Sequence, residues 1–555
     1  MLDPACAADS TKAKKTLTGG GAVETAYLTG AAITPDTIAE AEKIVGVQFT
    51  HAERVQIARS AVGQRRRFEQ RRTVGFLPNG LPPATSFNPM LPGMSVPTGA
   101  SGVRLSRPGT RPLPGTDEAI AFAPVTDLAG WIRERTLSSE RLTRIYLDRL
   151  KRFDPKLHCV VTLTEELALR QARRADREIG AGKYRGPLHG IPWGAKDLFE
   201  TDGIRTTWGS MPYRDRMGKG DAHVVRKLEE TGAVLVAKLT LGALAMGDVW
   251  FKDVTRNPFK LEQGSSGSSA GSAAATAAGL VGFALGTETL GSIVSPCMRC
   301  GATGLRPTFG RVARTGAMAL CWSMDKIGPI CRTVEDTALV LNEINGSDEG
   351  DPSSVDVPFQ YDPGSGLNAT TVGWSPSWFE GRASERDRKA LEAVKRLGVR
   401  MVEVELPDEP VHALRTILRT ESAAAFEEMT LSDHDDFLVR QNDGAWPNSF
   451  RSAWFVPAIE LIQADRLRRR VMEKMAGVFD KVDMLICPSF VANLLTTTNF
   501  TGHPSLTLRS GFRADGTPDG ITLWGRLFEE GRLCRVGREL EEALGVWNQR
   551  PDLNV

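Results

Sequence analysis

Hydrophobic residues recur at two different periods in the middle of the chain. Leu142, Tyr146 and Leu150 are spaced as on one face of a helix, and residues 222–232 are also predicted to be helical, ending at Gly232. Three short apolar runs have the length of buried strands: residues 160–163, 233–237 and 280–285. Helices that alternate with buried strands are typical of an α/β fold, so the pattern predicts a sheet covered by helices on both faces.

Helix start signals extend this pattern toward the N-terminus. Thr34 precedes Pro35 as a cap precedes a proline at the first helical position, and Thr50 with Glu53 has the spacing of a capping box. The second of these helices is expected to run toward Arg72.

The chain divides by composition into unequal parts. At 555 residues it exceeds the roughly 100–200 residues of a typical domain. Residues 1–30 are small and polar and are interpreted as a disordered or flexible tail. Residues 31–115 combine the two predicted helices with a Pro/Gly-rich linker, and residues 116–555 are predicted to form the main domain. Within that domain, residues 345–480 show a less regular pattern and are interpreted as a variable insertion.

The composition restricts what the protein is expected to bind. Hydrophobic residues make up 41% of the chain and charged residues 25%, as in soluble globular proteins. A formal net charge of +2 gives no electrostatic reason to expect a nucleic acid partner. The chain shows no signal-like N-terminal stretch and no apolar run of membrane-spanning length, so we expect a cytoplasmic protein without membrane contact.

The eight cysteines are scattered along the chain and do not predict a disulfide framework. Cys297 and Cys300 have the spacing of half a zinc site. No second pair of ligands follows at a suitable spacing, so neither a metal nor a cofactor is predicted.

A Gly/Ser-rich tract, residues 264–272, is the first candidate for chemistry. A phosphate-binding loop would need a Lys-Ser/Thr ending or a GxGxxG pattern, and the tract has neither. A flexible linker would separate domains, whereas this tract runs directly into residues 272–278, an alanine-rich segment predicted to be a closely packed helix.

A nucleophile elbow is a third interpretation of the tract. Residues 267–271 match the elbow pattern, which would make Ser269 the nucleophile with His434 or His503 as its base. The elbow requires a strand that leads into the turn, and residues 257–263 are not predicted to form one.

Lys196 suggests a different route to the same type of chemistry. A serine hydroxyl is a poor nucleophile until a base removes its proton, and a lysine can be that base if burial lowers its pKa. Lys196 lies in an apolar, glycine-lined segment, residues 190–199. The alternative is that Lys196 forms an ion pair with a buried carboxylate such as that of Asp197.

Several motifs, taken in order, resemble the amidase signature family. The matching segments are residues 186–197, 267–279, 286–292, 301–311, 501–505 and 525–528. The resemblance extends from about Thr116 to Leu553 and implies that residues 116–555 form an amidase signature catalytic domain, with residues 345–480 on the substrate side. The implied fold is a large mixed twisted sheet with helices on both faces, preceded by an N-terminal helical extension.

The resemblance also implies a Ser–cis-Ser–Lys triad. By motif position, Ser292 is the nucleophile, Ser268 is the bridging serine after a cis peptide bond, and Lys196 is the base. The backbone N–H groups of four residues would stabilise the oxyanion: Thr289, Leu290, Gly291 and Ser292.

Three positions depart from the usual family pattern. Leu290 stands where glycine is common, which a positive φ would disfavour. Glu288 replaces a frequent Asp and Val294 replaces a frequent Arg, so the ion pair between those two positions is expected to be absent. These differences bear on the substrate more than on the proton relay.

Three enzymatic functions therefore remain open. The main one is an amidohydrolase that cleaves a small-molecule amide, aryl amide, carbamate or ester through an acyl-enzyme. The alternative is the glutaminase-type subunit of a tRNA amidotransferase, and an esterase that uses Ser269 is a further one. The oligomeric state, a homodimer among the possibilities, is not fixed by the sequence.

Overall fold

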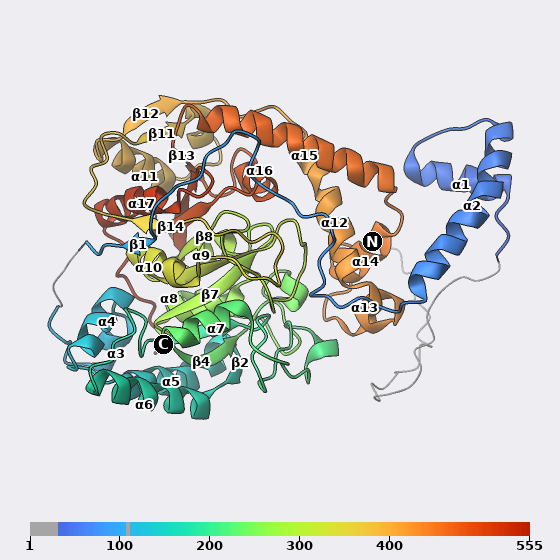
Figure 1. The fold of residues 1–555 in the computed structure, drawn as a ribbon. Coiled ribbons are helices and arrows are strands. Elements are labelled where there is room, and N and C mark those ends of the chain that lie inside the picture. Colours follow the sequence, from blue (N-terminus) through green and yellow to red (C-terminus); the bar gives the residue numbers. More distant parts are fainter. Residues whose placement is uncertain (1–30, 107–110, 555) are drawn as a thin grey trace, which may run out of the picture.

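A computed structural model describes residues 31–106 and 111–554. The predicted tail, residues 1–30, lies outside the described residues. The centre of the molecule is an 11-stranded mixed sheet with helices against both faces (Figure 1), which confirms the predicted fold class. Across the sheet the strands are β12 (Arg400–Glu403), β11 (Thr371–Trp374), β13 (Met484–Pro488), β15 (Pro518–Gly525), β14 (Ser505–Phe512), β8 (Thr303–Arg306), β9 (Lys326–Cys331), β7 (Phe283–Glu288), β3 (Pro192–Lys196), β4 (Val234–Leu239) and β2 (Val160–Leu163).

Seventeen α-helices are found in the described part of the chain, and most pack around this sheet. They are α1 (Pro35–Val45), α2 (His51–Arg72), α3 (Asp117–Ala121), α4 (Val125–Arg133), α5 (Ser139–Leu157), α6 (Glu165–Gly180), α7 (His223–Glu230), α8 (Ala270–Ala277), α9 (Val294–Cys300), α10 (Val334–Ile344), α11 (Glu385–Arg396), α12 (Arg415–Ala425), α13 (Glu427–Leu431), α14 (Trp446–Ala453), α15 (Ala458–Phe479), α16 (Leu494–Thr501) and α17 (Glu530–Leu544).

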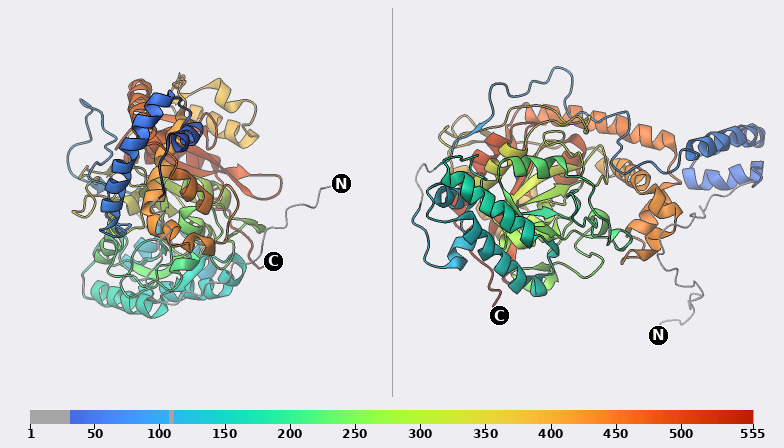
Figure 2. Two further views of the ribbon diagram at one scale, coloured as in Figure 1. Left: turned by 90° about the vertical axis from the view of Figure 1, so that its right-hand side faces the viewer. Right: turned by 60° about the horizontal axis from the view of Figure 1, so that its bottom comes forward.

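The N-terminal helices form a hairpin that projects from the body (Figures 1 and 2). Both predicted start signals are confirmed: Thr34 caps α1 ahead of Pro35, and Thr50 forms a capping box with Glu53 at the start of α2. Since capping satisfies backbone N–H groups that a helix leaves free, each helix is fixed at its first turn. After α2, residues 77–106 run along the body (Figure 1), and α3 begins after its cap, Thr116.

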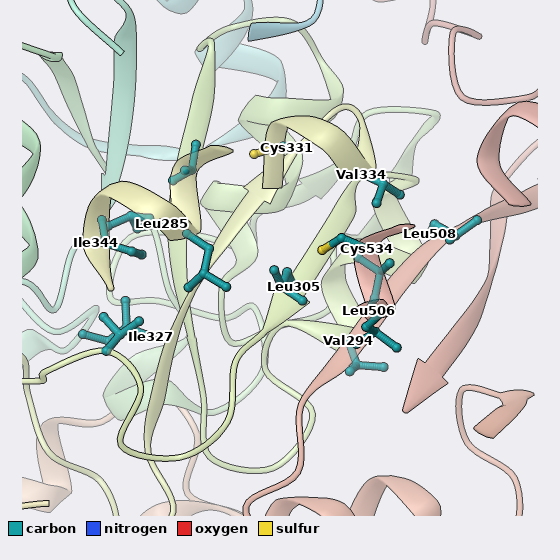
Figure 3. Packing of buried hydrophobic residues seen from close by; sticks show 14 of the residues in the cluster. Leu285, Val294, Leu305, Ile327, Cys331, Val334, Ile344, Leu506, Leu508 and Cys534 are labelled. Carbon is teal, nitrogen blue, oxygen red and sulfur yellow. The ribbon is translucent and has the colours of Figure 1, made fainter. Parts of the chain in front are cut away.

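Two clusters of interleaved apolar side chains pack against the sheet, and Figure 3 shows part of the larger one. Figure 3 shows Leu285 of β7, Leu305 of β8 and Leu506 of β14 packed with Val334 and Cys534 from the covering helices α10 and α17. All five side chains are buried. The rigidity of such a close-packed interior fixes where the strands end.

Two segments differ from the sequence pattern. The strand predicted at residues 280–285 forms three residues later, as β7, and so carries Thr287 and Glu288 into the sheet. The insertion at residues 345–480 is more regular than predicted, because it contains helices α11–α15 and the sheet strands β11 and β12. Each of its helices buries an apolar face against the body. The hydrophobic period of a single short helix is not detected when it is averaged with the loops and strands around it.

Candidate active site

Three segments far apart in the sequence meet where β3 and β7 end. These strands are parallel neighbours, with Ala195 opposite Leu285, so Lys196 and the residues after Glu288 lie at the same edge of the sheet. Helix α8 begins at Ala270, directly after the two serines of the Gly/Ser tract. This edge therefore holds the predicted base and both predicted serines.

Lys196 is completely buried and lies among hydroxyl groups. Its Nζ is 2.9 Å from Ser268 Oγ, 3.0 Å from Ser269 Oγ and 2.8 Å from Thr287 Oγ1. Burial lowers the pKa of Lys196 to about 7, although the nearby carboxylates of Asp325 and Glu288 act in the opposite direction. Near neutral pH, a large share of this amine is uncharged and able to accept a proton.

Asp197 does not pair with Lys196. Its carboxylate is 3.3 Å from the Nζ of Lys238 on β4 and accepts hydrogen bonds from the N–H and hydroxyl of Thr207. Asp197 and Lys238 are both fully buried. The interpretation that Lys196 forms an ion pair with Asp197 is therefore wrong, because the carboxylate of Asp197 pairs with Lys238 on the neighbouring strand.

Ser269 is held in place by the end of strand β7. Its hydroxyl donates to the carbonyl of Thr287 at 3.0 Å and accepts from the N–H of the same residue at 3.1 Å. Because the one hydroxyl proton is directed at a carbonyl, Ser269 can only accept from Lys196. This arrangement suits a residue that orients the amine better than one that attacks a substrate.

The elbow interpretation also lacks its base and its sheet context. His503 is buried, bonded to Thr501 and stacked on Phe479, and burial lowers the pKa of its imidazole to about 3. Ser269 has its hydrogen-bond partners among Lys196 and the backbone of β7, and neither His503 nor His434 is one of them in the described part of the chain.

One expectation about the segment before Ser269 is wrong. Residues Lys260–Gly264 do form a strand, β6, where none was predicted. It pairs only with the two-residue strand β5 (Arg256–Asn257), in a small sheet separate from the main one. Two-residue pairing is too short to give a periodic hydrophobic signal, which is why the pattern missed it.

Ser268 and Ser292 lie in adjacent loops. The peptide bond between Gly267 and Ser268 is cis. The N–H of Ser269 donates to the carbonyl of Ser292 at 3.1 Å, which joins the two loops. Ser292 is 7% exposed and Ser268 1%, so the predicted nucleophile is the more accessible of the two. Among the described residues no hydrogen bond joins their two hydroxyls directly.

The loop between Glu288 and α9 offers free backbone donors. Within residues 31–106 and 111–554, no acceptor takes the N–H of Thr289, Leu290, Gly291 or Ser292. Gly291 adopts the positive φ of 88°, while Leu290 is not among the residues with positive φ. Leucine at 290 is therefore compatible with the loop. Unpaired N–H groups in a buried loop are rare, and here they point to a place for a negatively charged oxygen.

Glu288 forms a buried ion pair after all. Its carboxylate is 2.7 Å from Arg306 of β8 and accepts the N–H groups of Ile293 and Val294. Burial acts to raise the pKa of Glu288, but Arg306 and these hydrogen bonds lower it to about 2. Position 294, a valine, supplies no cation, as expected; Glu288 pairs instead with Arg306 on a distant strand, which the sequence pattern did not predict.

The structure adds participants that sequence reasoning missed. Thr287 binds both Lys196 and Ser269, Asp325 accepts the hydroxyl of Thr289, and Arg306 fixes Glu288. Thr287 lies within a motif already singled out, residues 286–292. Arg306 lies within another such motif, residues 301–311, but nothing there indicated its partner, and Asp325 lies outside all of the motifs.

The CxxC pair of α9 lies in the interior of the protein. Cys297 and Cys300 are free, buried thiols, and burial raises the pKa of both. In the described ranges, no three potential ligands among His, Cys, Asp and Glu are grouped to hold a metal ion.

None of the described helices combines the length and apolar character needed to cross a bilayer.

The chain is similar to known proteins over most of its length. The family model described as Amidase matches residues 141–496. A glutamyl-tRNA(Gln) amidotransferase subunit from Heliobacterium modesticaldum is 32% identical, over 76% of this chain and 96% of that protein. The corresponding protein from Pseudomonas syringae pv. tomato is 33% identical, over 77% and 99%. The solved structure of native peptide amidase from Stenotrophomonas maltophilia has a TM-score of 0.70 and 29% identity, over 78% of this chain and 99% of that one.

Proposed function

The chain belongs to the amidase signature family, and on that premise we propose that it hydrolyses a carbon–nitrogen acyl bond with Ser292 as nucleophile. Ser268 and Lys196 form the proton relay. The observation that carries the proposal is the buried amine of Lys196, 2.9 Å from Ser268 Oγ and with a pKa lowered to about 7. The proposal would have no basis if the amine of Lys196 were exposed to solvent or far from Ser268.

The relay follows from the hydrogen-bonding capacity of each group. A neutral amine has two protons and one lone pair. Ser269 can only accept, and Thr287 Oγ1 can accept as well, so the two amine protons have partners and the lone pair is left for the proton of Ser268. Ser268 passes its proton to Lys196 while it takes one from Ser292.

Bond making and breaking then proceed at the edge of the sheet. Ser292 Oγ attacks the carbonyl carbon, and the negative oxygen is stabilised by the N–H groups of residues 289–292. Loss of one donor of this kind typically costs about 10²–10³ in rate. Lys196 returns the proton through Ser268 to the leaving nitrogen, the C–N bond breaks, and water hydrolyses the acyl-enzyme by the same relay.

A second function uses the same chemistry within a complex. The curated relatives described above are subunits of glutamyl-tRNA(Gln) amidotransferases, and they favour this function. In that case the substrate amide belongs to glutamine, and the chain works together with partner proteins. The peptide amidase neighbour and the helical extension, residues 31–115, favour a free hydrolase of small or aryl amides, with carbamates and esters as further substrates.

One set of assays tests the hydrolysis and separates the two functions. Ser292→Ala is expected to abolish hydrolysis of a chromogenic anilide and of glutamine while the circular dichroism spectrum stays unchanged. Ser295→Ala is the matched control, because this half-buried serine lies one turn further on and bonds only to the hydroxyl of Ser266. Full turnover by Ser292→Ala would end the proposal. Co-purification of partner chains with tRNA, together with preference for glutamine, would select the amidotransferase function.

A further inference from the structure

A short segment of the N-terminal extension lies against the loop that connects β8 to β9. We call residues 77–83 the strap. Asn79 fixes the strap with a pair of hydrogen bonds to Ala319: its Nδ2 donates to the carbonyl and its Oδ1 accepts from the N–H, both at 2.8 Å. The indole N–H of Trp322 donates to the carbonyl of Asn79 at 3.2 Å, and Asn79 also donates to the carbonyl of Ala425 at 3.3 Å.

This attachment is more specific than general surface packing. Asn79 uses both polar atoms of its side chain and its carbonyl on groups 240 residues or more away in sequence. The strap precedes residues 141–496, which the family model matches. Its contacts are therefore an addition of this chain to the part that the family model describes.

The strap closes one side of a cavity that borders the candidate active site. Thr287 and Thr289 line the cavity at one end, and Gly80 and Pro82 of the strap line it at another. The apolar part of the wall consists of Leu198, Ala245, Ala317, Met318, Leu320 and Trp322. Since Thr287 contacts Lys196 and Thr289 belongs to the loop with free N–H groups, a substrate held at Ser292 extends toward this space.

The charged side chains in the wall are already paired. Arg314 binds the carboxylate of Asp351 at 2.9 Å and donates to the carbonyl of Trp322. Asp325 accepts hydrogen bonds from the Thr289 hydroxyl and from two backbone N–H groups, and Lys326 donates to the carbonyl of Met324. An ionic substrate group would have to break one of these arrangements, whereas an apolar group would not.

The cavity is also small. It encloses about 70 Å³, roughly half of the 150 Å³ that holds a benzene molecule in an engineered apolar cavity. A group larger than a few carbon atoms would therefore press against the strap or Trp322. The side that can yield is the strap, because it is a loop attached through one asparagine, whereas the opposite wall is part of the sheet.

Resting on the proposed hydrolase function, we propose that this cavity receives a compact, uncharged apolar group next to the scissile C–N bond. The strap sets the size limit of that group through Asn79 and Trp322. The N-terminal extension thus contributes specificity to a site whose chemistry comes entirely from the main domain.

Two variants move the size limit in opposite directions. Asn79→Ala releases the strap. We expect the ratio of kcat/KM for large substrates to kcat/KM for the smallest substrate to rise about tenfold or more. This is the effect of losing hydrogen bonds that together contribute about 1.4 kcal/mol. Gly80→Phe adds a ring at the cavity wall and is expected to lower the same ratio. A Cβ at Gly80 would meet no atom within 4 Å, so the backbone tolerates this change.

The assay uses the full chain and two substrate series. One series lengthens the acyl chain of 4-nitroanilides from acetyl to octanoyl, and the other enlarges the aryl amine of acetamides. Gln360→Ala is the matched control, because Gln360 fixes another part of the extension with its amide, through the carbonyls of Thr98 and Ala100, and does not line the cavity. The control should keep the selectivity of the wild type.

The outcomes separate this inference from the proposed function. Suppose that the wild type hydrolyses amides. If both Asn79→Ala and Gly80→Phe then keep the wild-type preference for substrate size in both series, the inference is wrong and the function stands. If the wild type cleaves no amide, the function fails, and calorimetric binding of the same anilides to Ser292→Ala, with and without Asn79→Ala, still tests the cavity. If the affinity depends on substrate size in the same way with and without Asn79→Ala, the inference is also wrong.

Discussion

Hydrolysis should depend on pH through the single amine of Lys196. This amine acts as a base only when neutral, and burial lowers its pKa to about 7. For such a group the neutral fraction falls from about 0.9 at about pH 8 to about 0.01 at about pH 5. We therefore expect kcat/KM to fall about 90-fold over this range, with a slope approaching tenfold per pH unit below about pH 6.

The measurement is a profile of kcat/KM against pH for an uncharged anilide, in buffers of constant ionic strength. An uncharged substrate confines the titration to the protein. Each sample is returned to about pH 8 and assayed again, so that a reversible titration is distinguished from acid unfolding. Lys196→Ala should be severely slowed, with the largest loss near neutral pH.

Stability gives a readout of the same amine without catalysis. The pKa of Lys196 in the fold lies below its ordinary value of 10.5, so between about pH 7 and about pH 10 the unfolded chain binds more protons than the folded one. The free energy of unfolding therefore rises with pH in this window. Lys196→Met should show a smaller rise in urea unfolding experiments, because Lys238, whose pKa is also lowered by burial, still contributes to it. A flat rate profile between about pH 5 and about pH 8, or full activity of Lys196→Ala, would refute the neutral-amine mechanism.

Three further results are expected. Arg306→Met leaves the carboxylate of Glu288 buried without its cation and should cost about 3–5 kcal/mol in urea unfolding; an unchanged midpoint would contradict the buried pair. Ser269→Ala removes one hydrogen bond of about 1 kcal/mol from the amine, so turnover should fall only about fivefold to tenfold, whereas complete loss would revive the elbow interpretation. Gly271→Ala would place a Cβ 2.5 Å from two backbone atoms and should destabilise by about 1–3 kcal/mol, while Gly63→Ala in α2 meets no atom within 4 Å and should not lower the thermal midpoint.

Elements with an internal period could be predicted from the sequence. The predicted strand at residues 233–237 is β4 and the predicted helix at residues 222–232 is α7, each within about two residues. The strand is apolar because both of its faces are buried, and the helix has one apolar face. The capping signals at Thr34 and Thr50 also gave true helix starts. A pattern confined to one element carries enough information to place that element.

Contacts between distant segments could not be predicted in this way. The cation that pairs with Glu288 comes from Arg306 of β8, and the clamp on Ala319 comes from Asn79 in a linker. Arg306 lies in a motif, residues 301–311, that does not indicate its partner, and Asn79 lies in no motif. The sheet order, in which β8 and β9 lie between β14 and β7, brings Arg306 to the site, and that order is a property of the whole fold.

Two buried lysines on neighbouring strands show how the fold decides which amine can act as a base. Lys196 ends β3 and Lys238 lies on β4, opposite Ala195, and both are completely buried. Asp197 follows Lys196 directly, yet successive side chains of an extended chain point to opposite sides, so its carboxylate turns away and binds Lys238. Burial lowers the pKa of Lys238 as well, but there the carboxylate of Asp197 favours the ammonium form. The side-chain partners of Lys196 are hydroxyl groups, which carry no negative charge to favour the ammonium form. The adjacent carboxylate, whose position in the sequence argued against Lys196 as a base, thus serves the other lysine and leaves Lys196 free to lose its charge.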